Sequence, residues 1–145
     1  MKTIVVGTDG SESSLLAVAQ AAEIAAKFGA RLHVTYVMSL ATDIPFGMAG
    51  SMPLPEGFAE QATAAANDVV TRAAEVAKAA GATTETHVCQ GEASHALVDL
   101  CEELSADLLV VGSRGMTGAA RFLLGSVPNR CAHHAHCSVL IARTN

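Results

Sequence analysis

Short apolar runs alternate with longer amphipathic stretches along the whole chain. Four helices are predicted over residues 11–28, 58–80, 94–104 and 126–134, where apolar positions recur at helical spacing. Residues 39–57, broken by proline and glycine, are expected to form the one long loop, and such loops are usually functional or mobile. The five expected strands are rich in β-branched and aliphatic residues: Ile4–Gly7, Arg31–Met38, Thr83–Cys89, Ala106–Val111 and Ser138–Arg143.

This alternation of strand and helix predicts an α/β fold of one domain, residues 1–145. Right-handed crossovers would give an open, mostly parallel five-stranded sheet with helices on both faces. With the strand order 3-2-1-4-5, the first and fourth strands would diverge at a switch point, where such sheets bind ligands. Thr8-Asp9-Gly10-Ser11 ends the first strand and Gly112 ends the fourth, so both would face one crevice.

The strongest chemical signal lies between the fourth strand and the last helix. The apolar run ending at Val111 opens into a loop punctuated by Gly112, Gly115 and Gly118 and closed by Gly125-Ser126. Glycines let backbone N–H groups approach a ligand, and a helix N-terminus adds unpaired donors and a positive dipole end. We expect Ser126 to cap this helix, with Pro128 in its first turn. Together these features predict an anion cradle suited to nucleotide phosphates.

Composition narrows the classes of partner. Only 3% of the residues are aromatic, so the core is expected to consist of Ala, Val, Leu and Ile. The net charge of −5 and the absence of a cluster of Lys and Arg argue against binding to nucleic acid or membrane surfaces. No apolar run approaches the ~20 residues of a membrane span, and the first strand starts too early for a signal peptide. The four cysteines have no scaffold-like spacing. Reduced thiols and a cytoplasmic location are therefore expected.

A second cluster, Cys131 to Cys137, contains three histidines between two cysteines. These residue types suit zinc, but the segment spans a helix end and a strand start and lacks the usual ligand spacing. We therefore expect no metal site here. Cys89 and Cys101 are expected in the core.

Taken in order, the motifs resemble the universal stress protein family over essentially the whole chain. The resemblance rests on Ile4–Ser11, Gly91-Glu92-Ala93, Gly112–Gly115, Leu124–Val127 and Val139–Arg143. It implies a Rossmann-like five-stranded sandwich of the adenine nucleotide alpha hydrolase type and a role in the stress response. It also implies a homodimer formed through the last strand, Val139–Arg143.

Members with this glycine motif bind ATP or a related adenine nucleotide, and the resemblance implies the same here. By position, Thr8 and Asp9 would lie by base and ribose, and the Val37 backbone would meet the adenine edge. The alternative for Asp9 is a purely structural part, capping the first helix or binding loop amides, but a carboxylate at a strand end beside a switch point favours ligand contact. The phosphates and ribose would be held by Gly112, Ser113, Arg114, Gly115, Gly125, Ser126 and Val127.

Pro128 departs from the family pattern, because relatives often have a hydroxyl residue at this position. Proline offers neither a hydroxyl nor an N–H, which weakens the expected grip on an outermost phosphate. The choice among ATP, with Mg²⁺, and ADP, AMP or cyclic AMP therefore stays open.

Three functions are consistent with this sequence. No Walker lysine, nucleophile elbow or His-Glu-x-x-His pair occurs, so a binding and sensing module is favoured over an efficient enzyme. A weak metal-dependent ATPase or autophosphorylating protein using Asp9 is the first alternative. A structural, partner-binding dimer with an empty crevice is the second.

Overall fold

The computed structural model describes residues 1–39, 55–114 and 124–143. Its five strands form one parallel sheet in the order β3-β2-β1-β4-β5. This confirms the predicted fold class and strand order. The strand bounds lie within two residues of those expected: β1 (Thr3–Gly7), β2 (Arg31–Met38), β3 (Thr83–Gln90), β4 (Leu108–Gly112) and β5 (Ser138–Ala142).

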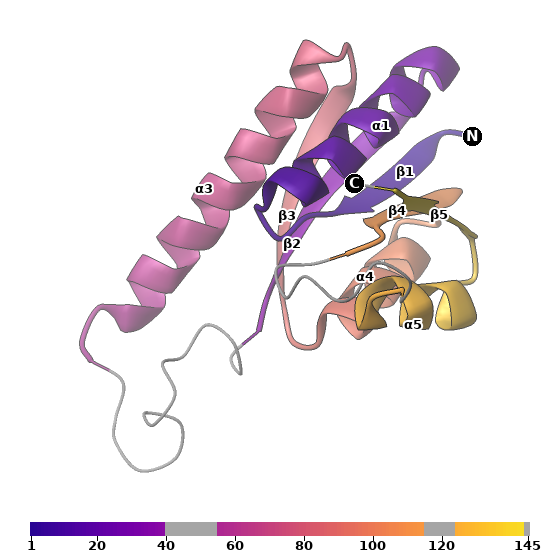
Figure 1. Cartoon of the computed structure of the whole chain (residues 1–145). Coiled ribbons are helices and arrows are strands. Elements are labelled where there is room, and N and C mark those ends of the chain that lie inside the picture. The colour runs from indigo at the N-terminus through magenta and orange to yellow at the C-terminus, as the bar shows by residue number, and fades with distance from the viewer. Residues whose placement is uncertain (40–54, 115–123, 144–145) are drawn as a thin grey trace.

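Helices cover both faces of the sheet, as Figure 1 shows. The helices α1 (Glu12–Phe28) and α3 (Phe58–Ala79) pack on one face. The helices α4 (Ala93–Glu103) and α5 (Ser126–His134) pack on the other. Most of the predicted long loop, residues 40–54, lies outside the described residues.

The core has two parts because the central strands are buried on both faces. Ile4 and Val6 of β1 belong to the cluster on the α1 and α3 side, while Val5 between them joins the cluster on the α4 and α5 side. All three side chains have no solvent exposure. Successive side chains of a strand point to opposite faces, so one unbroken apolar run serves both layers.

The ends of α1 follow from two residues that the sequence singled out. Ser11 is the N-cap, and its side-chain oxygen accepts a hydrogen bond from the Ser14 N–H. Gly29 ends the helix with φ +63°, a left-handed conformation that glycine adopts at little cost. Because Ser11 also belongs to the turn that follows β1, the cap fixes the start of α1 to that turn.

The start of α5 corrects one prediction. The N-cap is Gly125, and Ser126 is the first helical residue, so its hydroxyl does not cap the helix. Gly125 accepts the first hydrogen bond of the helix from the Asn129 N–H and donates its own N–H to the Ser113 carbonyl. The α5 N-terminus therefore has no side-chain cap.

Within the part of the chain that the structure describes, no helix combines the length and the apolar character that crossing a membrane requires.

Candidate functional site

A cavity opens at the carboxyl ends of the strands, where β1 and β4 lie side by side and the chain continues from them in opposite directions across the sheet. This is the switch point at which open parallel sheets bind ligands. Its volume is about 210 Å³, below the range of about 300–1,000 Å³ that is usual for small-molecule pockets. The cavity therefore suits a compact ligand.

The turn from β1 to α1 forms one wall. Thr8 is tied into this turn, because its hydroxyl contacts Ser14 Oγ at 2.8 Å and accepts from the Gly10 N–H. Asp9 Oδ1 accepts from the N–H and the hydroxyl of Ser11, at 2.9 and 2.5 Å. Asp9 therefore binds a loop amide, as its structural alternative expected, and it also lines the cavity.

The opposite wall joins the end of β4 to the start of α5. Ser113 holds this wall together, since its N–H donates to the Ala142 carbonyl and its own carbonyl accepts from Gly125. In the first turn of α5, the N–H groups of Ser126 and Val127 have no intrahelical acceptor, and Pro128 has no N–H. Two backbone donors and the positive end of the helix dipole therefore face this side of the cavity.

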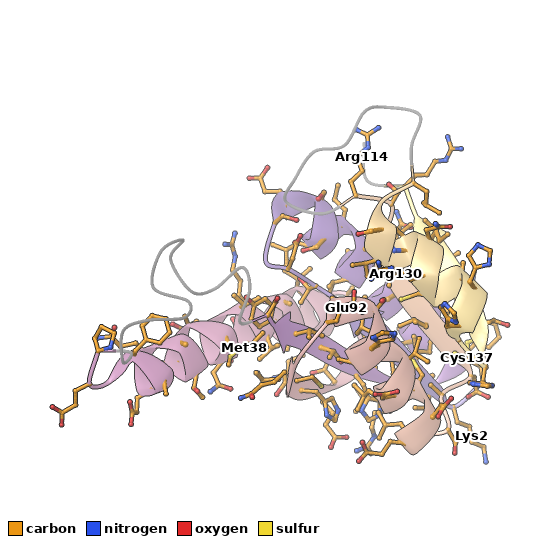
Figure 2. All side chains as sticks on the ribbon, turned by 90° about the horizontal axis from the view of Figure 1, so that it is seen from below. Lys2, Met38, Glu92, Arg114, Arg130 and Cys137 are labelled. Carbon is orange, nitrogen blue, oxygen red and sulfur yellow. The ribbon has the colours of Figure 1, made fainter. Side chains whose placement is uncertain are left out.

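The two helices on this face are linked by an ion pair beside the cavity. Glu92 caps α4, and its Oε1 lies 3.4 Å from Nη1 of Arg130 in α5; the two side chains lie close together in Figure 2. Partial burial opposes ionisation of Glu92, but hydrogen bonds from Ser94 and His95 and the Arg130 charge lower its pKa to about 2. The carboxylate is thus ionised at neutral pH.

Strand β2 supplies the floor. Val37 and Thr35 lie on the face of the sheet covered by α4, and both line the cavity. The Thr35 side chain has no solvent exposure, and its Oγ1 has no hydrogen-bond partner among the described residues. A buried hydroxyl without a partner is uncommon in proteins and calls for an explanation.

Most of the predicted site residues meet in this cavity. Ser113 lies beside it and supports the wall, and Gly115 falls outside the described residues. The predicted residues that line it are Thr8, Asp9, Val37, Gly112, Arg114, Gly125, Ser126 and Val127.

Sequence reasoning missed the apolar side of the cavity and Thr35 on its floor, although it predicted Val37 there. Ala93 and Leu97 of α4 form that apolar side, together with Val111 at the end of β4. These residues look like ordinary core residues in the sequence, which carries no signal for them. Thr35 did carry a signal, since a hydroxyl in a strand expected to be central is either hydrogen bonded or functional.

Some of the cysteines pack in the core, and the metal site considered for the cluster Cys131 to Cys137 can be examined in the structure. Cys131 and Cys101 are buried in the cluster under α4 and α5, whereas Cys89 is only half-buried. Burial raises the pKa of the Cys131 thiol to about 11, with smaller contributions from Glu92 and Cys137. Across residues 1–39, 55–114 and 124–143, no group of three His, Cys, Asp or Glu side chains is arranged to hold a metal ion.

Comparison with known proteins shows which family the chain resembles over its length. The model of the universal stress protein family matches residues 1–143. Universal stress protein Rv1636 of Mycobacterium tuberculosis is 39% identical over 144 residues, covering 99% of this chain and 97% of its own length. Universal stress protein MJ0531 of Methanocaldococcus jannaschii is 33% identical over 142 residues, covering 98% of this chain and 82% of its own.

Solved structures agree with the fold. A universal stress protein crystallised in complex with cAMP is 39% identical, with a TM-score of 0.74 over 99% of this chain and 98% of that one. Protein MJ0577 superposes with a TM-score of 0.81 over 99% and 96% of the two chains. At 19% identity, that second match supports the fold alone.

Proposed function

The chain belongs to the universal stress protein family, and from that premise we propose that it binds an adenine mononucleotide in the cavity between β1 and β4. The observation that carries the proposal is the cavity itself, which combines Asp9, the glycine-flanked end of β4 and the N-terminus of α5. The 39% identical relative crystallised with cAMP supports the same ligand class.

Among the described residues, the number of hydrogen-bond donors favours a ligand with one phosphate. Ser126 and Val127 offer two backbone N–H groups, and Arg114 adds a cation on the same side. Pro128 ends that row of donors, so the α5 N-terminus offers nothing further to a triphosphate tail. We therefore place AMP and cyclic AMP ahead of ATP with Mg²⁺.

The proposed role is that of a stress-response sensor rather than an enzyme. Efficient phosphoryl transfer needs metal ligands and charge-stabilising groups placed in line with the reacting phosphate. Asp9 is the one carboxylate lining the cavity among the described residues, and its Oδ1 is already bonded to Ser11. Slow ATP hydrolysis would need a divalent ion recruited by this single group.

Thermal unfolding with a nucleotide panel tests the proposal. AMP or cyclic AMP at about a hundredfold over its dissociation constant should stabilise the protein by about 2.7 kcal/mol. For a chain of this size the unfolding midpoint should rise by about 5–10 °C. ATP and ADP, with and without Mg²⁺, are the comparison ligands, and GMP is the control for the base.

A larger shift with ATP and Mg²⁺ than with AMP would reverse the proposed preference. The absence of a shift with every adenine nucleotide would contradict binding and leave the partner-binding dimer as the function to test.

We also propose a homodimer through β5, which is an edge strand of the sheet. Val139, Leu140 and Ile141 are only half-buried there, and an edge strand presents unpaired backbone groups. Antiparallel pairing with a second copy would satisfy those groups and cover the apolar side chains. Sedimentation equilibrium should give the mass of two chains, and a monomer at every concentration would refute the dimer.

A further inference from the structure

Three of the four cysteines gather at the end of α4 that lies opposite the candidate nucleotide cavity. Cys101 belongs to the last turn of α4, Cys131 lies in α5, and Cys137 directly precedes β5. All three pack in the cluster under α4 and α5. Arg114, which lines the nucleotide cavity, lies far from Cys137 in Figure 2. These thiols therefore form a feature that nucleotide binding does not use.

Cys101 and Cys137 form a contacting pair within this group. A hydrogen bond joins their side chains, whereas the interaction of Cys131 with each of them is electrostatic. The pair lines a second cavity, of about 360 Å³. Glu102 and His136, the residues next to the pair along the chain, are themselves linked, with 2.7 Å between Oε1 and Nε2. Two neighbouring contacts thus hold the end of α4 against the segment that leads into β5.

The two thiols differ in their access to solvent. Cys101 is 4% exposed, and burial, followed by the charge and the hydrogen bond of Cys137, raises the pKa of its thiol well above the ordinary value. Cys137 is half-buried. The cavity that it lines opens to solvent, because Glu102 and His136 on its rim have side chains that are 52% and 77% exposed. A small oxidant therefore reaches Cys137 first, while Cys101 stays protonated beside it.

We propose that Cys101 and Cys137 form a reversible disulfide when the protein meets a hydroperoxide, which makes this end of α4 a redox-sensitive site. The inference goes beyond the proposed function and does not depend on it. Cys137 is the attacking thiol because it is the accessible member of the pair. Cys101 is the resolving thiol, which needs only contact with Cys137 and no access to solvent.

The reaction has two steps. The Cys137 thiolate attacks one oxygen of the hydroperoxide, so that an S–O bond forms, the O–O bond breaks and Cys137 becomes a sulfenic acid. The other oxygen leaves as an alcohol, or as water from hydrogen peroxide, after taking up the proton that the thiol had released. The Cys101 sulfur then attacks the Cys137 sulfur: the S–S bond forms, the S–O bond breaks, and the departing hydroxide takes the Cys101 proton to form water. The two thiols together lose two electrons, which the hydroperoxide gains.

The new bond would close a loop from residue 101 to residue 137, which contains β4 and α5. A disulfide across a loop of this length restricts the unfolded chain and thereby stabilises the folded one. Oxidation of the full chain should therefore raise its unfolding midpoint by about 5–15 °C. Dithiothreitol should reverse the rise.

The test treats the reduced protein with excess hydrogen peroxide and then titrates its thiols after denaturation. The reduced chain contains four cysteines, and one disulfide should leave two thiols to titrate. Denaturing electrophoresis without reductant should show the mass of a single chain. Dithiothreitol should restore the thiols, because a disulfide is reversible whereas sulfinic acid is not.

Variants at three of the cysteines separate their roles. Cys137→Ala replaces a half-buried residue and should show neither a disulfide nor the peroxide-induced rise in midpoint. Cys101→Ala should stop at the sulfenic acid of Cys137, which dimedone traps. Cys89→Ala is the matched control: Cys89 is also half-buried, but it lies in β3, and burial raises the pKa of its thiol. This variant should lose two thiols and gain the same rise as the wild type.

Four results would overturn the inference. They are a wild-type protein that keeps all its thiols in peroxide, a loss of thiols that dithiothreitol does not reverse, a doubled mass that assigns the disulfide to two chains, and a disulfide that still forms in Cys137→Ala. None of them involves a nucleotide. The proposed function would therefore stand or fall separately, in the thermal unfolding experiment with the nucleotide panel.

Discussion

Replacing Val111 by phenylalanine is expected to weaken nucleotide binding by at least about 100-fold, or about 2.7 kcal/mol. Val111 is the residue before the last of β4, is 3% exposed and lines the cavity from the face covered by α4 and α5. The rest of its surroundings is packed, so a larger ring must occupy the cavity itself. Calorimetric titration with AMP measures the loss, and the cost in stability should stay within the ~1–3 kcal/mol of an overpacked core site.

The neighbouring residue provides the control. Val110 is fully buried on the opposite face, in the cluster with α1 and α3, and lines no part of this cavity. Val110→Phe should therefore destabilise the protein at least as much as Val111→Phe. Its folded fraction should nevertheless bind AMP with wild-type affinity. If Val111→Phe also binds normally, the nucleotide site lies elsewhere.

Replacing Leu109 by alanine is expected to lower the free energy of unfolding by about 2–5 kcal/mol. Leu109 has no exposed surface and lies in a central strand, packed in the cluster under α4 and α5. Truncation removes buried methyl groups and leaves a cavity that a strand paired on both sides cannot close. Urea unfolding followed by circular dichroism measures the change, with the denaturant slope expected to stay constant.

Leu16 makes the matched comparison, because the same substitution there removes the same atoms from an exposed position. Its side chain is 50% exposed on α1. Leu16→Ala should change the free energy of unfolding by less than about 0.5 kcal/mol. Equal losses at the two positions would contradict the assignment of Leu109 to the core.

The elements of this fold were predictable because each one carries a local signal. The bounds of β2 match those expected from its apolar and β-branched residues, and α1 ends at Phe28 as predicted. These signals depend on neighbours a few residues away. The strand order was expected from the doubly wound arrangement that alternating strands and helices commonly adopt, and the structure confirms it.

Errors arose where side-chain chemistry competed with tertiary hydrogen bonding. Ser126 has the residue type of an N-cap, but Gly125 holds that position because the Ser113 carbonyl accepts its N–H. The backbone of Ser113 links β5 to the start of α5, which no local pattern indicated, and its contact with a ligand stays a prediction. No local pattern indicates which backbone group a distant strand will claim.

The sequence by itself determined the elements, their order, the family and the glycine-flanked loop of the candidate site. Tertiary structure alone decided which side chains share the cavity, because its walls come from segments as far apart as Thr8, Thr35, Leu97 and Val127. It also decided that Thr35 would be buried without a partner, since that depends on Gly7 and His87 in the two neighbouring strands. Residue identity sets what a side chain can bond to, and the register of the sheet sets what lies within its reach.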